Sequence, residues 1–289
     1  MIPTRLNLAL VAGSTSGCAA LLWGASHAER AWQIALCAVA FSFLNNTVFS
    51  LTHEAVHGVL HPDPTLNRWL GRWTSAFFPT GFGLQRALHL GHHRRNRSAV
   101  ERFDYIGPDE SAVMKVVQWY GLLLGFFWVL SPITNAALAI APGWLERAAN
   151  RLAAQTSGPA MMEGVEEADR RLLRWESAGM FAVQGLLFWA LDGSWTGWAT
   201  CYGAFALNWC SLQYADHAWS PLDVKEGAWN LRVSPPVQWL FLNYHLHLVH
   251  HRHPKLPWIH LPEHVRPDDP RPSFLAIYAR MWLGPRRLP

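Results

Sequence analysis

Long apolar runs alternate with short polar and basic segments along this chain. A helix needs about 20 predominantly apolar residues to cross a bilayer. Four runs have this character, and they fall into two pairs: 6–24 with 31–51, and 176–191 with 195–215. Short polar turns join the members of each pair, SHAER in the first and Asp192, Gly193 and Ser194 in the second. The pattern therefore predicts two transmembrane helical hairpins.

A fifth apolar run, residues 115–141, is long enough to cross the bilayer but carries Ser131 and Pro132 at its middle. Proline removes a backbone hydrogen bond inside a helix and breaks it. Basic stretches flank the run at 68–102 and 147–174, and basic residues favour the cytoplasmic side of a membrane. Both stretches stay on that side if the run enters the membrane and returns. We therefore predict a partly inserted, re-entrant hairpin here.

Composition supports a membrane protein. Charged residues make up 15% of the 289 residues, against roughly 25% in soluble domains. The net charge of +4 comes mostly from arginines between the apolar runs, which is a membrane-orientation pattern and not a nucleic-acid-binding one. We expect an all-α, multi-pass membrane protein with a single domain over residues 1–289 and a cytosolic helical cap. The arginine, alanine and tryptophan bias suggests a GC-rich bacterial genome, so we expect an inner-membrane protein whose active site faces the cytoplasm.

Histidines gather in three clusters with helical spacing: HEAVH at 53–57, HLGHH at 89–93 and HLVHH at 247–251. Positions i, i+3 and i+4 share one helix face, so each cluster is expected to present its imidazoles in one direction. A zinc site uses three or four protein ligands, whereas these clusters supply more, which indicates two metal ions. Imidazole suits zinc, copper, iron and nickel. The candidate ligands are His53, His57, His89, His92, His93, His247, His250 and His251.

The order HxxxH, HxxHH and a distant second HxxHH, interleaved with paired apolar runs, resembles the integral-membrane fatty acid desaturase and hydroxylase superfamily over about residues 41–262. In members of that superfamily, the histidine boxes hold a non-haem di-iron centre. The resemblance implies a further ligand, His217 in QYADH, and a water-mediated role for Gln213, where acyl-CoA desaturases commonly have asparagine. Carboxylates often orient ligating imidazoles, which makes Glu54 and Asp216 candidates for that role.

The resemblance implies an enzyme that uses two irons and dioxygen to oxidise C–H bonds of a fatty acyl or similar lipid chain. A desaturase is expected, and a hydroxylase of the same superfamily is the alternative. The substrate that the resemblance implies is a free acid or an acyl group on a carrier protein, coenzyme A or a lipid. The chain has no dinucleotide fingerprint and no C-x-x-C set, so an external electron donor such as ferredoxin or rubredoxin, with its reductase, is implied. Six aromatic residues are candidates to line space for the acyl chain, although most of them are expected to be packing or interfacial residues: Trp69, Trp73, Phe77, Phe78, Trp209 and Trp239.

Two other functions are compatible with parts of the pattern. HEAVH fits the H-E-x-x-H pattern of zinc proteases, and an intramembrane protease would pair it with an aspartate such as Asp192, but both HxxHH boxes then go unexplained. A membrane metal transporter or haem-binding electron carrier is the other alternative, although transporter ligands are expected near mid-membrane. The remaining histidines are expected to be core or interfacial residues: His27, His61, His245, His253, His260 and His264.

Overall fold

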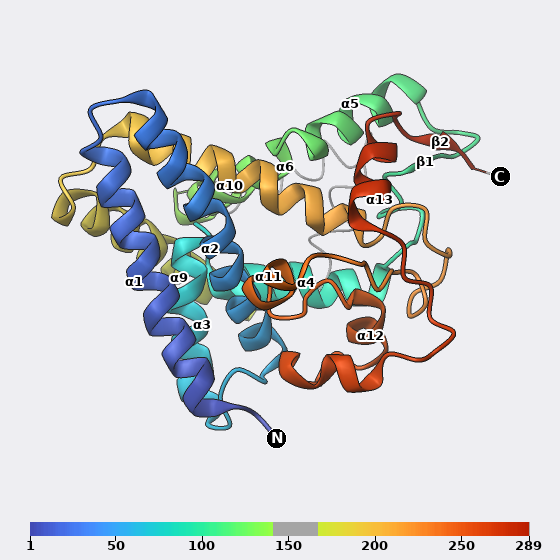
Figure 1. The fold of residues 1–289 in the computed structure, drawn as a ribbon, viewed down its shortest axis with the longest axis horizontal. Coiled ribbons are helices and arrows are strands. Elements are labelled where there is room, and N and C mark those ends of the chain that lie inside the picture. The colour runs from blue at the N-terminus through green and yellow to red at the C-terminus, as the bar shows by residue number, and fades with distance from the viewer. Residues whose placement is uncertain (141–166, 289) are drawn as a thin grey trace.

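The computed structural model describes residues 1–140 and 167–288, and in these parts it is built almost wholly from helices (Figure 1). The elements are α1 (Thr4–Ser26), α2 (Ala31–His57), α3 (Pro64–Phe77), α4 (Phe82–Arg95), β1 (Tyr105–Ile106), α5 (Ala112–Leu123), α6 (Phe126–Ile140), α9 (Glu167–Ala190), α10 (Trp195–Ala215), α11 (Pro235–Leu240), α12 (His247–Arg252), the 3₁₀-helix η1 (Trp258–His264), α13 (Phe274–Met281) and β2 (Arg286–Arg287). The prediction of an all-α fold is confirmed. Part of the basic stretch at 147–174, and residue 141 of the fifth apolar run, lie outside the described residues.

The helix α1 packs along α2 as a hairpin, whereas α9 and α10, joined by a tight turn, pack mainly against other helices, α9 against α6 and α10 against α2. The α1–α2 turn and the α9–α10 turn lie together. Nε2 of His27, just after α1, is 3.8 Å from Oδ2 of Asp192 in the α9–α10 turn. The hydroxyl of Ser194 accepts a hydrogen bond from the Gly197 amide at 3.0 Å and so caps the start of α10. A side chain at Gly197 would meet the backbone of Ala25 at 2.7 Å. Glycine therefore lets α10 pack closely against α1.

Two of the described helices, α1 and α2, are long and apolar enough to cross a membrane, and the bent pair α5 and α6 qualifies as a third element. These match the predicted runs 6–24, 31–51 and 115–141. Among the described residues α9 and α10 do not meet the same criterion, because charges at the start of α9 and polar residues such as Asn208 in α10 lower their hydropathy. Membrane insertion of the second hairpin therefore stays a prediction.

The fifth apolar run is bent, but not where the sequence analysis placed the break. Pro132 lies inside α6, and the 87° bend falls between α5 and α6. Gly125 at this bend has φ 83°, a left-handed conformation that glycine adopts without steric cost. A Cβ there would also meet the α10 backbone at Ala206 at 3.0 Å. The glycine, and not the proline, therefore sets the position of the bend.

The chain after α10 forms a cap of short elements that lies against the end of α2 (Figure 1). The amide of Trp258 donates to Glu54 Oε2 at 3.1 Å, and its indole Nε1 donates to Asn7 Oδ1 at 3.0 Å. On the other side, the Trp119 indole donates to the carbonyl of Met281 at 2.7 Å, and β1 pairs in parallel with β2. These contacts fix the cap, which carries α12, over the C-terminal end of α2.

Candidate metal centre

The nine histidines that the sequence analysis singles out as ligands come together in the structure and divide into two groups. The first group contains His53, His57, His89, His93 and His250, and the second contains His92, His217, His247 and His251. Within each group, one nitrogen from every ring lies within 4.8 Å of the corresponding nitrogens of the others. Four separate parts of the chain therefore converge on one polar cluster.

The two HxxHH boxes divide between the groups in opposite ways. On α4 the outer pair, His89 and His93, joins the first group, and the middle histidine joins the second. On α12 the outer pair, His247 and His251, joins the second group, and the middle histidine joins the first. Because each helical residue turns by about 100°, the two outer histidines project about 40° apart and the middle histidine projects at the edge of the same face, toward the neighbouring group. Each HxxHH box thus contributes to both groups, whereas both histidines of HEAVH join the first group. The rings of one HxxHH box face the same cluster but do not all belong to one group.

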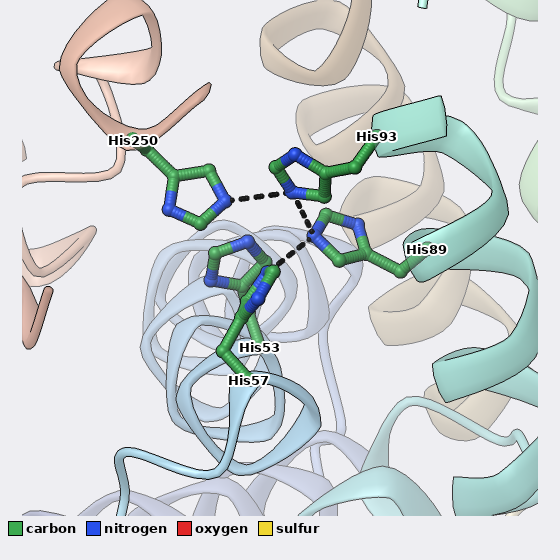
Figure 2. Close-up of side chains that lie close together, drawn as sticks. All are labelled: His53, His57, His89, His93 and His250. Atoms are coloured by element: carbon green, nitrogen blue, oxygen red, sulfur yellow. Dashed lines mark hydrogen bonds between the residues drawn. The ribbon is translucent and has the colours of Figure 1, made fainter. Parts of the chain in front are cut away.

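In the first group the imidazoles face each other through Nε2 atoms (Figure 2). Nε2 of His89 lies 2.8 Å from Nε2 of His57 and 3.1 Å from Nε2 of His93. Nε2 of His93 is also 3.0 Å from Nε2 of His250, and the buried Nε2 of His53 has no hydrogen-bond partner. A neutral ring nitrogen either carries one proton or offers one lone pair, so these contacts cannot all be satisfied as hydrogen bonds. One cation at the centre would accept all the lone pairs.

The second group has Nδ1 atoms that are held from outside, which leaves Nε2 to point inward. Nδ1 of His217 donates to the carbonyl of Gly227 at 2.8 Å. Nδ1 of His92 lies 2.7 Å from Oε2 of Glu101, whose other oxygen accepts from Arg95 Nε at 3.1 Å. Such contacts fix the tautomer and orientation of a ligating ring. The sequence analysis missed Glu101, because no recognisable pattern links this carboxylate to the box on α4.

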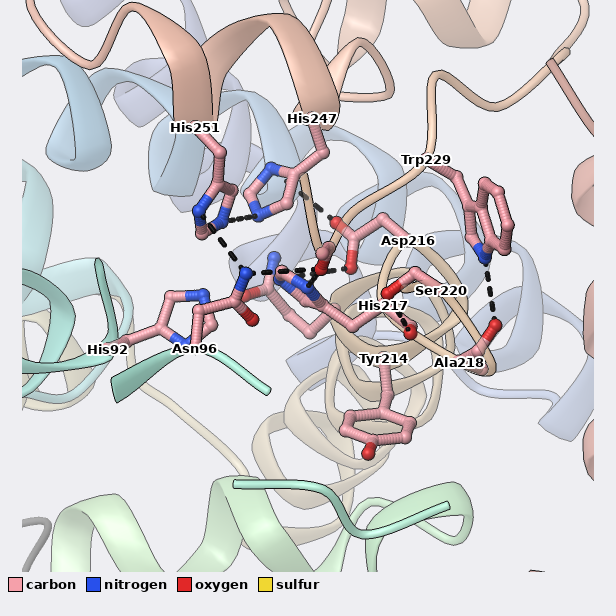
Figure 3. A network of polar contacts seen from close by, with 12 residues as sticks. His92, Asn96, Tyr214, Asp216, His217, Ala218, Ser220, Trp229, His247 and His251 are labelled. Carbon is pink, nitrogen blue, oxygen red and sulfur yellow. Dashed lines mark hydrogen bonds and ion pairs between the residues drawn. The ribbon is translucent and has the colours of Figure 1, made fainter. Parts of the chain in front are cut away.

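The other two rings of this group have polar side chains near their Nδ1 atoms (Figure 3), but Nδ1 of His247 makes no hydrogen bond. Oδ2 of the buried Asp216 lies 3.6 Å from Nδ1 of His247, so its position agrees with the orienting role expected for it. Nδ2 of Asn96, which donates to the Gly227 carbonyl at 3.1 Å, lies 3.5 Å from Nδ1 of His251. Asn96 ends α4 in the same turn that carries the second box, and the sequence gives no separate sign of its role.

Burial favours the neutral form of His89, His93, His250 and His251. Removal from water lowers the pKa of His89, His250 and His251 well below the usual value, and the neighbouring rings lower it further. The same effects lower the pKa of His93 to about 2. A neutral imidazole has a free lone pair, and metal binding requires that form. The cluster is therefore a set of ligands ready to bind metal at neutral pH.

Two further candidates lie apart from the ring nitrogens. Glu54 is buried, and its carboxylate accepts the Trp258 amide, so its observed contact anchors the cap and does not orient a histidine. Gln213 lies beside the second group, where its Oε1 accepts a hydrogen bond from the Tyr244 hydroxyl at 3.3 Å. Its side-chain NH₂ has no hydrogen-bond partner among the described residues. Gln213 thus faces the space next to the metal ligands, as its predicted role requires.

An apolar-walled cavity of about 160 Å³ adjoins the cluster. It touches His89 of the first group and His92, His217 and His247 of the second, and its far wall includes Phe103, Leu122, Phe127, Trp209 and Cys210. Of the aromatic residues predicted to line such a space, Trp209 does so. The others lie in the core or are exposed: Phe77, Phe78, Trp69, Trp73 and Trp239. We call this cavity the acyl cavity, after the ligand that the resemblance implies; its wall includes histidines of both groups.

The zinc-protease hypothesis does not fit the geometry. Asp192 lies beside His27, at the end of the α1–α2 hairpin opposite to HEAVH (Figure 1). In a zinc protease of this type, Glu54 would face the metal, but here it contacts the cap. His53 and His57 are also joined by three histidines from α4 and α12 in the first group. The six histidines expected to be core or interfacial residues stay outside both groups within the described parts of the chain.

Comparison with known proteins agrees with this site. The family model described as "Fatty acid desaturase" matches residues 30–282. A similar protein from rice (Oryza sativa subsp. japonica), described as "Sphingolipid delta(4)-desaturase DES1-like", is 34% identical over 124 residues, covering 39% of this chain and 36% of the rice protein. The match to the family model extends over most of the chain, including every histidine of the two groups. The chain therefore belongs to the fatty acid desaturase family.

Proposed function

We propose that this protein is a membrane-bound di-iron oxidoreductase that uses dioxygen to desaturate a fatty acyl or similar lipid chain. The observation that carries the proposal is the acyl cavity: its wall includes histidines of both groups and, opposite them, apolar side chains. A lipid segment held there lies against both metal positions at once. Buried apolar walls also keep water away from the reacting carbon.

The donor set fits two metal ions, and we propose that both are iron. The first group offers five ring nitrogens and the second offers four, and an orphaned Nε2 on His53 requires a partner. Bound iron supplies the activation of dioxygen that removal of hydrogen from an unactivated C–H bond requires. The protein's own residues orient the ligands: Glu101 and the Gly227 carbonyl hold Nδ1 of His92 and His217. Gln213 is proposed to interact through water at the edge of the second group.

Desaturation and hydroxylation use the same site, and the name of the rice relative favours desaturation. Expression with a compatible ferredoxin and reductase, followed by lipid mass spectrometry, separates them. A product that has lost two hydrogen atoms supports a desaturase, and one that has gained an oxygen atom supports a hydroxylase. Lipids of unchanged mass, from cells in which the protein is folded and iron-loaded, would contradict both.

A second experiment tests the acyl cavity apart from the metals. Leu122 is 7% exposed and lines the cavity, so Leu122→Trp should fill it and lower product formation about tenfold or more while iron content stays normal. Leu130, on the neighbouring α6, is 54% exposed and lies outside the cavity, so Leu130→Trp is the matched control. Normal product from the Leu122 variant would exclude this cavity as the substrate site.

The histidine cluster is proposed to lie at the cytoplasmic face of a bacterial inner membrane. His53 and His57 occupy the last turns of α2, and the exposed arginines Arg68, Arg86 and Arg94 follow them in the chain, in keeping with the positive-inside bias. A cysteine introduced at Arg68 should react with a membrane-impermeant maleimide in inverted vesicles and not in intact spheroplasts. The reverse pattern would place the site on the other side.

A further inference from the structure

A second cavity approaches the histidine cluster from a different side. It has a volume of about 550 Å³, reaches His57 of the first group, and is lined by Arg68, Arg72, Arg86 and Arg94. We call it the arginine cavity. The acyl cavity touches neither His57 nor these arginines. The metal ligands can therefore be approached by two routes of opposite character, one apolar and one cationic.

The helix α4 separates the two routes. Its face with His89 and His92 lines the acyl cavity, whereas Arg86, Leu90 and Arg94, spaced one helical turn apart, line the arginine cavity. Side chains at i and i+4 share a helix face, so the arginines form a stripe beside the box. A partner bound to this stripe would lie against the helix that carries three of the ligands.

Most of the positive charge at the arginine cavity is not neutralised by the described parts of the chain. Arg72 pairs with Glu176 at 2.7 Å. Arg68 is exposed and reaches the hydroxyl of Thr65. Arg86 and Arg94 are exposed and make no hydrogen bond or ion pair with residues 1–140 or 167–288. Within residues 1–140 and 167–288, three guanidinium groups thus have no acidic partner and can meet an anionic one.

The helix α3 carries exposed apolar side chains beside this charge, and the guanidinium of Arg72 stacks over the ring of Trp69 at 4.8 Å. Leu66, Trp69 and Trp73 are exposed apolar residues at i, i+3 and i+7 and suit the membrane interface, where tryptophan is enriched. Arg68 and Arg72 occupy an adjacent face of the same helix and line the arginine cavity. Because Arg72 stacks on Trp69 and pairs with Glu176, Arg68 is the cation of α3 that is placed to meet an acidic partner while the tryptophans meet a lipid surface.

We propose that the arginine cavity is the docking site of an acidic electron-transfer protein, with His57 at the point of electron entry. The proposal rests on the proposed function. Desaturation consumes one dioxygen, two substrate hydrogens, two protons and two electrons, and it releases two waters. The two electrons come one at a time from a reduced iron–sulfur protein that is oxidised in each encounter. Charge complementarity of this kind accelerates and orients association.

The test measures donor binding separately from catalysis. Purified full-length protein in nanodiscs of zwitterionic lipid is titrated with an acidic ferredoxin and an acidic rubredoxin at low and high salt. The variant Arg68→Glu/Arg86→Glu/Arg94→Glu should weaken binding about tenfold or more at low salt and remove most of the salt dependence. Arg280→Glu, a reversal of an exposed arginine on α13, should bind as the wild type does. Arg68→Glu/Arg94→Glu, which keeps Arg86 beside His57, should show a smaller loss.

Other results would overturn the docking proposal. It fails if neither donor protein binds the wild type in a salt-dependent way, if the triple variant binds normally, or if Arg280→Glu weakens binding equally. It also fails if the triple variant loses a co-purifying anionic phospholipid but binds donor normally. A chemical reductant with a small mediator should restore product formation in the triple variant. If this bypass yields no product even from iron-loaded wild type, the proposed function fails instead.

Discussion

Glu101 offers a sharp test of the site because it acts on a ligand without being one. Its carboxylate lies 2.7 Å from Nδ1 of His92 and accepts from Arg95 at 3.1 Å. Glutamine has the same shape but one acceptor oxygen and one NH₂ donor. In Glu101→Gln, the new NH₂ group therefore faces another N–H donor, on either His92 or Arg95, and one hydrogen bond is lost. The negative charge beside the His92 ring is lost as well. Loss of such an orienting partner typically costs 10- to 100-fold in metal affinity or activity, or about 1.4 to 2.8 kcal/mol.

The assay is iron retention against a chelator, together with product formation in the reconstituted system. Glu101→Gln should lose iron from one of its two positions faster than the wild type and form about 10- to 100-fold less product. Glu110→Gln is the matched control, because Glu110 pairs with Lys115 at 2.9 Å and touches no histidine of either group. Wild-type iron retention and turnover in Glu101→Gln would refute the orienting role.

Three other substitutions test separate parts of the structure. His92→Ala should abolish product formation, measured by lipid mass spectrometry. His264→Ala should not, because His264 is exposed and lies outside both groups. Full activity of His92→Ala would count against the assignment of His92 to the metal centre. Gly125→Ala should lower the free energy of unfolding by about 1–2 kcal/mol, because φ at this residue is 83°. Gly121→Ala is the control and should leave it unchanged, since nothing lies within 4 Å of the new Cβ. Equal melting temperatures of the two variants would contradict the account of the bend. Arg97→Met should destabilise the protein by about 3 kcal/mol or more, because it removes the guanidinium of a fully buried ion pair and leaves the carboxylate without its counter-charge. A melting temperature equal to that of the wild type would show that this ion pair is dispensable.

The gathering of the nine histidines is predictable from the sequence because helical spacing and a distinctive residue type carry the signal. HxxxH and HxxHH specify which rings share a helix, and the number of rings indicates two metals. The division of each box between two groups is not predictable in this way, because it depends on how α4 and α12 face one another. Glu101, Asn96 and the Gly227 carbonyl are missed for the same reason: their roles arise from tertiary contacts that no local pattern encodes.

For the helices, too, the sequence predicts local features but not those that depend on tertiary contacts. The apolar runs gave α1 and α2 nearly to their ends, since long apolar segments have few alternatives in a membrane. Pro132 misled the analysis because a proline that has room is tolerated inside a helix, while the positive φ of Gly125 is visible only in the folded chain. Glu54 looked like an orienting carboxylate because of its place in HEAVH, but it turns toward the cap segment, which is far away in sequence.

The most direct test of the two-metal centre is the metal content of protein purified from iron-supplemented cells, measured by elemental analysis with Mössbauer spectroscopy. The division of nine histidines into two groups predicts about two irons per chain in nitrogen-rich environments. It also predicts that replacing His217 and His247 of the second group by alanine leaves about one. A single zinc per chain, or two irons retained after that double replacement, would contradict the assignment.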